Sequence, residues 1–515
     1  MKQNYLSIFS WGLLLFSIIT SYSQFTENSF QFFFHSDSLG IPNFYKDIVN
    51  DNGQLKDWYW APSPSFFPDV AIYFLMATLF KLSVLKTLFI SGIVQVLILA
   101  NLLIYFFTKL VDDDLKKHKC FIPFFISLYF FESLYFSKDL QFSFYLMTLG
   151  FHIGSFLNAL ILVCFLINDR SSKIKYVFLF FFSIIASFND RLYIVMLLMP
   201  MSAALLLTIK NQNKRYAFIS IACIVSGSIL GLYSFKWINA HHFINFLSPH
   251  KIYAFENISS SFNMFIEQIK NCIINPGFAS FQIVFTIFSV IFCSVYGFIK
   301  RKTLPTHHLF LILFYILFCI FTWAAPIVNG NYTGYDTLRY NVYPFFFSSV
   351  IFAWLLGFII NKIANQLVSQ VIPLSMVAAA LFFIGLKINV KGVDTYINYY
   401  PDTVREIDSV ASIYHLKRGI SNYWIARKTT MLSKKKISIF SVYEGCNIQE
   451  LGTNINWYYN APFDFVVGNK LSQEAILKNF IIKDTIVTNH HTIFTVEKFI
   501  YPKGEYFPVL LAKKL

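Results

Sequence analysis

Long apolar runs constrain this chain more than any other feature of its sequence. Ile283–Phe298 and Leu309–Trp323 lack the polar stripe that an amphipathic core helix of a soluble protein carries. The composition agrees, because 56% of the residues are hydrophobic and 13% are charged, whereas a soluble domain has roughly 25% charged residues. The sequence therefore predicts a protein whose main solvent is the lipid bilayer.

The apolar runs predict about eleven transmembrane helices, since a helix needs about 20 apolar residues to cross a bilayer. They lie near 4–22, 87–108, 121–138, 152–168, 176–188, 192–208, 216–234, 280–299, 308–325, 342–361 and 367–386. The apolar segment 68–84 is shorter and ends in lysines, and we place it in the outer interface. Counting it as a span would reverse the membrane orientation of all later spans and loops. An extra pair of spans within 120–150 would favour that opposite orientation.

The basic residues fix the orientation that we expect. The chain has 42 Lys and Arg against 27 Asp and Glu, a net charge of +15. Basic residues are concentrated in short alternate loops, as expected on the cytoplasmic side; examples are Lys116, Lys117 and Lys119, and Lys300, Arg301 and Lys302. We predict a multi-pass protein of the cytoplasmic membrane with its amino terminus inside and its carboxyl terminus outside. The positive charge is a topology signal and does not indicate a nucleic-acid partner.

Two regions follow from this topology: a transmembrane region, 1–386, and an extracytoplasmic domain, 387–515. The first contains the first outer loop, 23–86, with interfacial helices. The second has runs of strand length between helical stretches, which predicts a small α/β domain. The expected strands are Ile437–Tyr443, Phe463–Val467 and Thr492–Val496, and the expected helices are Val404–Leu416 and Ala475–Phe480. The cysteines and histidines show no spacing typical of a metal site or a disulfide framework.

Acidic residues of the first outer loop are candidates for chemistry. Asp37 precedes a short interfacial helix, where a carboxylate could act as a base toward a hydroxyl or could simply cap the helix. Asp47 reads as a solvated helix residue. Asp69 opens the next apolar helix, as a cap or as a contact to substrate. Trp58 and Trp60 form either an aromatic belt or a platform that stacks on a sugar.

Other polar residues lie at the outer ends of the expected spans. Asp190 and Arg191 separate two apolar runs, and His152 opens the fourth span. Arg339 and Tyr340 precede the tenth span. An interfacial Arg could hold a lipid phosphate through two hydrogen bonds, or could snorkel or pair with an acidic neighbour. The spans hold almost no acidic residues, which argues against an ion-coupled transporter.

This arrangement resembles the GT-C superfamily of membrane glycosyltransferases, in particular the bacterial protein mannosyltransferase and aminoarabinose transferase type. The resemblance covers roughly residues 1–386. It rests on an Asp after the first span, a short helix, a Trp- and Pro-rich stretch, an interfacial helix and then a bundle of spans. Many members have a second acid where this chain has Ser38.

The resemblance implies a fold, an activity and site residues. The fold is an all-α polytopic bundle with a small α/β outer domain. The activity is transfer of a sugar from a polyprenyl-phosphate carrier to a glycan, lipid or protein acceptor. Asp37 is then the catalytic base, and Arg339, Tyr340 and Arg191 bind the carrier phosphate. The remaining candidates, which would contact substrate, are Asp190, His152, Trp58, Trp60 and Asp69.

Some alternatives stay open at this point. No cofactor is certain, although a divalent metal is compatible with the resemblance. An O-antigen polymerase or ligase would also have many spans and use lipid-linked sugars. A non-catalytic membrane protein with an outer interaction domain is a further alternative.

Overall fold

The structure, a computed structural model, describes residues 2–23, 34, 36–135, 142–168, 173–211, 214–247, 254–274, 278–333, 337, 342–363, 366–388, 390–459 and 462–499. Two predicted carrier-phosphate residues, Arg339 and Tyr340, lie outside the described residues.

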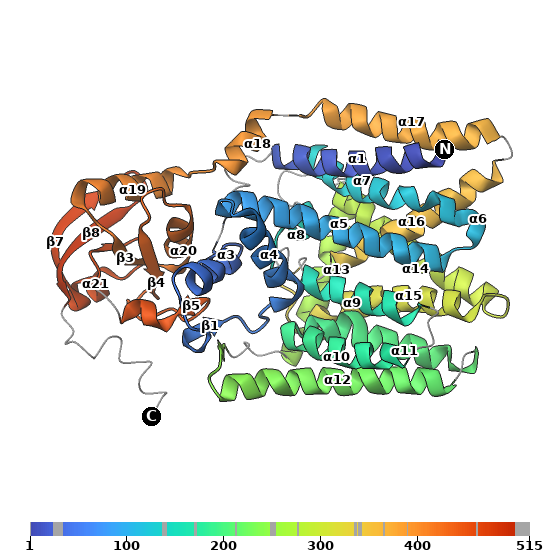
Figure 1. Ribbon diagram of the computed structural model, residues 1–515, viewed down its shortest axis with the longest axis horizontal. Helices are drawn as coiled ribbons and strands as arrows, with labels where there is room; N and C mark the ends of the chain where they lie inside the picture. The colour runs from blue at the N-terminus through green and yellow to red at the C-terminus, as the bar shows by residue number, and fades with distance from the viewer. Residues whose placement is uncertain are drawn as a thin grey trace.

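Most of the chain forms a bundle of apolar helices that run roughly side by side (Figure 1). The helices of the bundle and its connections are α1 (Lys2–Ser23), α5 (Val84–Leu110), α6 (Asp113–Lys116), α7 (Phe121–Tyr135), α8 (Phe142–Met147), α9 (Ile153–Leu166), α10 (Ile174–Asn189), η5 (Ile194–Leu198), α11 (Met199–Leu207), α12 (Lys214–Ala240), α13 (Ile258–Ile274), α14 (Phe278–Lys300), α15 (Thr306–Val328), α16 (Tyr343–Lys362) and α17 (Gln366–Gly385). Each of the predicted spans contains a helix.

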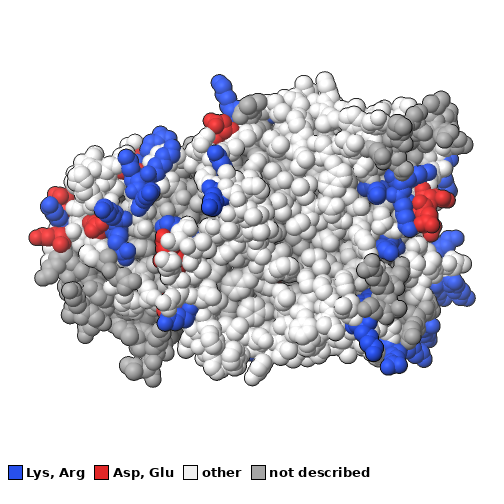
Figure 2. All heavy atoms as spheres, viewed as in Figure 1, with Lys and Arg blue, Asp and Glu red and all other residues white. Residues whose placement is uncertain are grey.

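Six helices of the described residues are long and apolar enough to cross a membrane: α1, α5, α12, α14, α15 and α16. Other predicted spans contain shorter apolar helices, so the count of about eleven is not confirmed. Figure 2 shows charged side chains gathered toward the two ends of the molecule, with a broad uncharged band between them. These features fit a multi-pass membrane protein.

The first loop contributes the short helices α3 (Gly40–Tyr45), η1 (Lys46–Asn50), η2 (Leu55–Asp57), η3 (Phe66–Val70) and α4 (Ala71–Phe80). At 1.5 Å per residue, the ten residues of α4 reach about 15 Å, roughly half the hydrocarbon thickness. Segment 68–84 thus contains a short helix, and its interfacial placement stays a prediction.

The strands gather in a small carboxyl-terminal region. Its elements are α18 (Val390–Ile397), α19 (Asp402–Tyr414), β3 (Arg418–Ser421), α20 (Tyr423–Leu432), β4 (Ser438–Ser441), β5 (Thr453–Asn454), η9 (Ile455–Tyr458), β6 (Phe465–Val467), α21 (Gln473–Asn479), β7 (Phe480–Val487) and β8 (Thr492–Phe499). Five strands form a sheet in the order β4-β3-β6-β8-β7. The pairs β3–β4 and β3–β6 are parallel, and β8 is antiparallel to β6 and β7. Separate apolar clusters cover the two faces of this sheet, with Ile420 and Val466 in one cluster and Phe465 and Val467 in the other. All three predicted strands and both predicted helices are present, whereas β3, β7 and α20 were not predicted.

A second, three-stranded sheet joins three segments that are far apart in the sequence. Its order is β2-β1-β5, where β1 is Trp58–Trp60 of the first loop and β2 is Asn245–Phe246 after α12. Tyr59 pairs with Asn245 on one side and with Thr453 on the other. Strand pairing therefore joins the carboxyl-terminal region to one end of the bundle, called the domain end below. The amino terminus lies at the opposite end (Figure 1).

Candidate active site at the domain end

Asp37 lies between the bundle and the carboxyl-terminal region. It is exposed and comes directly before α3. The Tyr423 hydroxyl, from α20, donates a hydrogen bond of 2.5 Å to Oδ1 of Asp37. The helix cap of α3 is Leu39, without a side-chain cap hydrogen bond. Asp37 is thus not a helix cap, and its carboxylate is held by the carboxyl-terminal region.

Arg427 holds this contact in place. Its Nη1 donates to the Tyr423 hydroxyl at 2.9 Å and to the carbonyl of Ser36 at 2.8 Å. Its Nη2 donates to the carbonyls of Leu451 and Gly452. Burial raises the pKa of Tyr423, so the hydroxyl stays protonated and donates toward the carboxylate. The guanidinium of Arg427 therefore orients the Tyr423 hydroxyl, which in turn orients the carboxylate of Asp37.

A second group of predicted residues meets at the ends of α9 and α10. The Nδ1 atom of His152, just before α9, lies 2.7 Å from Oδ2 of Asp190, just after α10. Asp190 also accepts hydrogen bonds from the hydroxyl of Ser63 and from the backbone N–H of Leu192. Burial opposes ionisation of Asp190, but the charge and hydrogen bond of His152 and the Leu192 N–H hold its pKa below the ordinary value. The structure therefore joins two predicted substrate contacts in one hydrogen-bonded pair, in which Asp190 is buried and His152 is partly buried.

Asp69 belongs to the same group and is 1% exposed. Its Oδ1 accepts a hydrogen bond of 2.8 Å from the backbone N–H of Gly150. Its pKa is raised from 3.8 to about 6, chiefly by burial and also by the charge of Asp190, while the N–H of Gly150 and the charge of His152 partly oppose the rise. Gly154 leaves room for the carboxyl, because a Cβ there would lie 2.1 Å from Oδ2. Asp69 makes no side-chain cap at α4, so the interpretation of this residue as a cap is wrong.

The interpretation of Asp47 as a solvated residue is also wrong, because the residue is 4% exposed. Its carboxylate accepts hydrogen bonds from the indoles of Trp58 and Trp457, at 2.7 and 2.6 Å, and from the amide of Asn454 at 2.8 Å. Sequence reasoning missed it because the donors on Trp457 and Asn454 come from the carboxyl-terminal region.

The two tryptophans predicted to contact substrate lie in an aromatic core. Trp58 is fully buried and Trp60 is 6% exposed. Phe44 packs edge-on against Trp58 and tilted against Trp60. Since neither ring presents an open surface, we leave both out of the proposed site.

Among the predicted phosphate-binding residues, Arg191 is described. Its guanidinium lies over the ring of Phe235, 5.5 Å from the centroid. Although Asp190 is its neighbour in sequence, the two form no salt bridge within the part of the chain that the structure describes. Arg191 therefore remains a cation at the domain end, next to the His152–Asp190 pair.

Sequence reasoning missed Tyr423 and Arg427 as site residues. Their spacing of four places both side chains on one face of a helix, a signal visible in the sequence. Asp37, which accepts the hydrogen bond of Tyr423, lies 386 positions before it, a separation that no local pattern reveals.

The described residues do not fit a divalent metal. They contain no group of three or more His, Cys, Asp or Glu side chains that could hold one. The acidic oxygens near His152 are engaged by protein N–H and O–H donors instead.

Comparisons with known proteins give structural matches. No protein-family model and no curated protein matches the chain. Two solved structures of the Archaeoglobus fulgidus oligosaccharyltransferase are similar to it, each at 10% identity and a TM-score of 0.42. The match to the complex with Zn and sulfate covers 83% of this chain and 62% of the oligosaccharyltransferase chain. The match to the apo form covers 89% of this chain and 69% of that chain. This chain thus spans about three-fifths of the first structure's length.

A similarity at this identity and TM-score identifies no activity.

Proposed function

We propose that this protein is a membrane glycosyltransferase of the GT-C type. It transfers a sugar from a polyprenyl-phosphate carrier to a glycan, lipid or protein acceptor at the domain end, which faces the outside of the cytoplasmic membrane. One observation carries the proposal: an exposed carboxylate, Asp37, sits where an apolar bundle meets a polar domain and is oriented by the Tyr423 hydroxyl. A base for this reaction must reach both a lipid-borne donor and a polar acceptor, and this position suits both.

The reaction follows from these groups. The acceptor hydroxyl attacks the anomeric carbon of the donor and transfers its proton to Asp37. The bond between the anomeric carbon and the phosphate oxygen breaks, and its electron pair leaves with the polyprenyl phosphate. Arg191, and Arg339 as predicted from the sequence, stabilise the negative charge on that leaving group.

The direct test is sugar transfer by the purified full-length protein in lipid nanodiscs. A panel of polyprenyl-phosphate sugars is supplied with acceptor glycans, and release of polyprenyl phosphate is measured. Loss of a positioned base typically reduces the rate by about 10²–10⁴-fold, so Asp37→Asn should lose transfer by that factor. Asp114→Asn is the matched control, since it makes the same change at an exposed carboxylate of the short helix α6.

The outcomes separate the alternatives. Near-wild-type transfer by Asp37→Asn rules out this base. If no donor is consumed by the wild-type protein, the non-catalytic alternative holds. A ladder of polymerised repeat units would instead identify a polymerase.

A further inference from the structure

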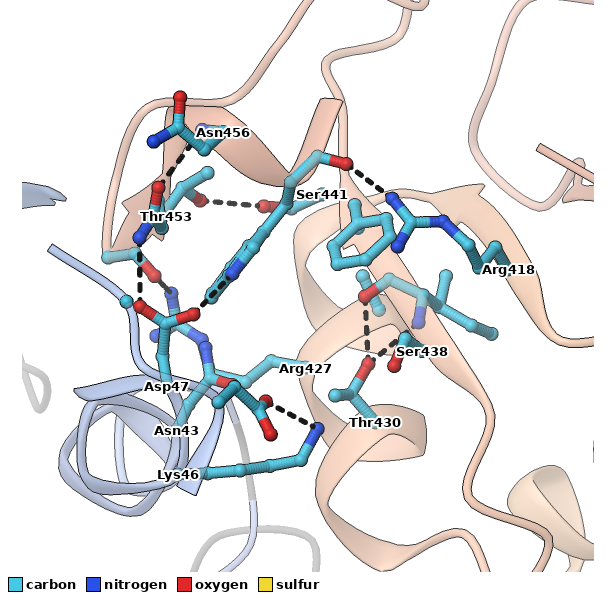
Figure 3. A pocket seen from close by; sticks show the side chains of 18 of the residues that line it. Asn43, Lys46, Asp47, Arg418, Arg427, Thr430, Ser438, Ser441, Thr453 and Asn456 are labelled. Carbon is cyan, nitrogen blue, oxygen red and sulfur yellow. Dashed lines mark hydrogen bonds and ion pairs between the residues drawn. The ribbon is translucent and has the colours of Figure 1, made fainter. Parts of the chain in front are cut away.

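A cavity of about 450 Å³ lies between the first loop and the carboxyl-terminal region (Figure 3). One wall comes from α3, η1 and residues 51–54, and the other from β3, α20, β4 and residues 452–457. We call it the interdomain pocket. Its volume is within the range of pockets that bind small molecules. None of the predicted site residues that the structure describes lines it.

The pocket has an aromatic wall that is fixed in place. Trp457 lines it and is only partly buried. The indole N–H of Trp457 donates to Oδ1 of Asp47 at 2.6 Å, and its ring packs against Phe440 with 5.5 Å between centroids. Asp47 also receives two further N–H donors, which lock its carboxylate. An aromatic surface held in one orientation is suited to the C–H face of a sugar ring.

One polar side chain of the wall makes no side-chain hydrogen bond among the described residues. It is Asn43, on α3, which is 5% exposed and lines the pocket, and its amide atoms are not fully enclosed by protein. A ligand hydroxyl, which both donates and accepts, would satisfy it.

The cations of the pocket differ in how many donors remain. Both terminal nitrogens of Arg427 are occupied by protein oxygens. Lys46 pairs with Asp51 at 3.5 Å. Arg418 lies over the ring of Phe440, and its Nη2 donates to a carbonyl at 2.6 Å. Its Nε is buried without a partner, and its Nη1 makes no hydrogen bond in the described part of the chain. Arg418 therefore has donors left for a ligand.

We propose that the interdomain pocket binds a saccharide unit that carries an anionic group. The sugar ring packs on Trp457, a ring hydroxyl hydrogen-bonds to Asn43, and Arg418 pairs with the anion. The anion is a carboxylate, as in a uronic acid, or a phosphate ester, which share the geometry that a guanidinium recognises.

The pocket also has a physical link to the proposed base. Arg427 lines the pocket and holds the Tyr423 hydroxyl, which in turn holds Asp37. Resting on the proposed function, this adjacency names the acceptor class as an acidic glycan. Binding itself does not depend on transfer.

Binding is tested by calorimetry on the purified full-length protein in detergent. Glucuronate, galacturonate and glucose 1-phosphate are titrated, with glucose and inorganic phosphate as comparison ligands. We expect at least one acidic sugar to bind more tightly than both comparison ligands. Arg418→Gln should weaken that binding by roughly 10–100-fold, the range for a hydrogen bond to a charged group. Asn43→Ala should weaken it by roughly 3–10-fold.

The controls separate binding from folding and from catalysis. Arg405→Gln removes an exposed Arg outside the pocket and should leave the affinity unchanged. Arg418→Lys keeps the charge but loses the forked geometry, and should recover part of the affinity. Thermal unfolding checks that each variant is folded. Asp37→Asn should lose transfer yet bind the acidic sugar normally, so the two proposals fail separately.

Three outcomes would overturn the pocket proposal. The first is that none of the acidic sugars binds. The second is that inorganic phosphate binds as tightly as the sugars, which would indicate an anion site only. The third is that folded Arg418→Gln and Asn43→Ala proteins both bind like the wild type.

Discussion

The buried carboxyl of Asp69 gives the protein a pH-dependent stability whose sign follows from its surroundings. The side chain accepts a hydrogen bond from the N–H of Gly150, and burial raises its pKa to about 6, whereas the ordinary value of 3.8 applies in the unfolded chain. Between these two values the folded protein binds more protons than the unfolded chain. By linkage, the free energy of unfolding therefore falls as pH rises through this window.

The magnitude follows from the size of the change. One pKa unit is worth about 1.4 kcal/mol, so ionising Asp69 costs about 3 kcal/mol above pH 6. Asp69→Asn removes this cost and keeps an oxygen to accept the N–H of Gly150. At pH 7.5 the variant should be more stable by up to about 3 kcal/mol, which corresponds to roughly 3 °C in Tm at about 2.1 cal/mol/K per residue. At pH 4.5 the difference should shrink to about 1 kcal/mol.

The assay is thermal unfolding in detergent, followed by tryptophan fluorescence, at several pH values from 4.5 to 7.5. Asp114→Asn, the exposed control, should unfold close to the wild-type temperature. The reasoning is refuted if Asp69→Asn is less stable than the wild type and the deficit grows with pH, since the carboxylate would then be stabilising.

Three further predictions concern residues at the domain end. Asp190→Asn breaks the pair with His152 and should destabilise the folded protein by about 3–5 kcal/mol. The deficit should shrink as pH falls, because the lowered pKa of Asp190 contributes stability only while its carboxylate is ionised. An unchanged Tm at pH 7.5 would contradict the pairing. Gly53→Ala would place a Cβ 1.9 Å from Oδ2 of Asp47 and should cost about 1–3 kcal/mol in thermal unfolding; a variant as stable as the wild type would mean that this contact is loose. Tyr423→Phe removes the hydroxyl that orients the proposed base and should reduce transfer by roughly 10-fold with little change in Tm; unchanged transfer would show that the hydroxyl does not act on the base.

The parts of the fold that the sequence predicts are those with local signals. The apolar runs became helices because backbone groups in lipid are satisfied within a helix. The strands around Phe440, Val466 and Phe494 were predicted from short apolar runs bounded by polar residues. In contrast, β3 is only four residues long and carries an Arg at its start, so its local pattern does not favour a strand.

The site was predictable only in part, for a physical reason. Residues at the ends of neighbouring helices, such as His152 and Asp190, can be paired from the expected topology. Residues held by a distant domain cannot, because the surroundings of Asp37 and Asp47 are set by a sheet that joins three separated segments. The local composition of the first loop does not reveal whether its acidic side chains are exposed or buried.

Release of polyprenyl phosphate by wild-type and Asp37→Asn protein, side by side in nanodiscs, tests the central claim most directly. The account predicts release by the wild type and a decrease of about 10²–10⁴-fold in a variant that folds normally and still binds the lipid-linked donor. Equal release by the two proteins would contradict it.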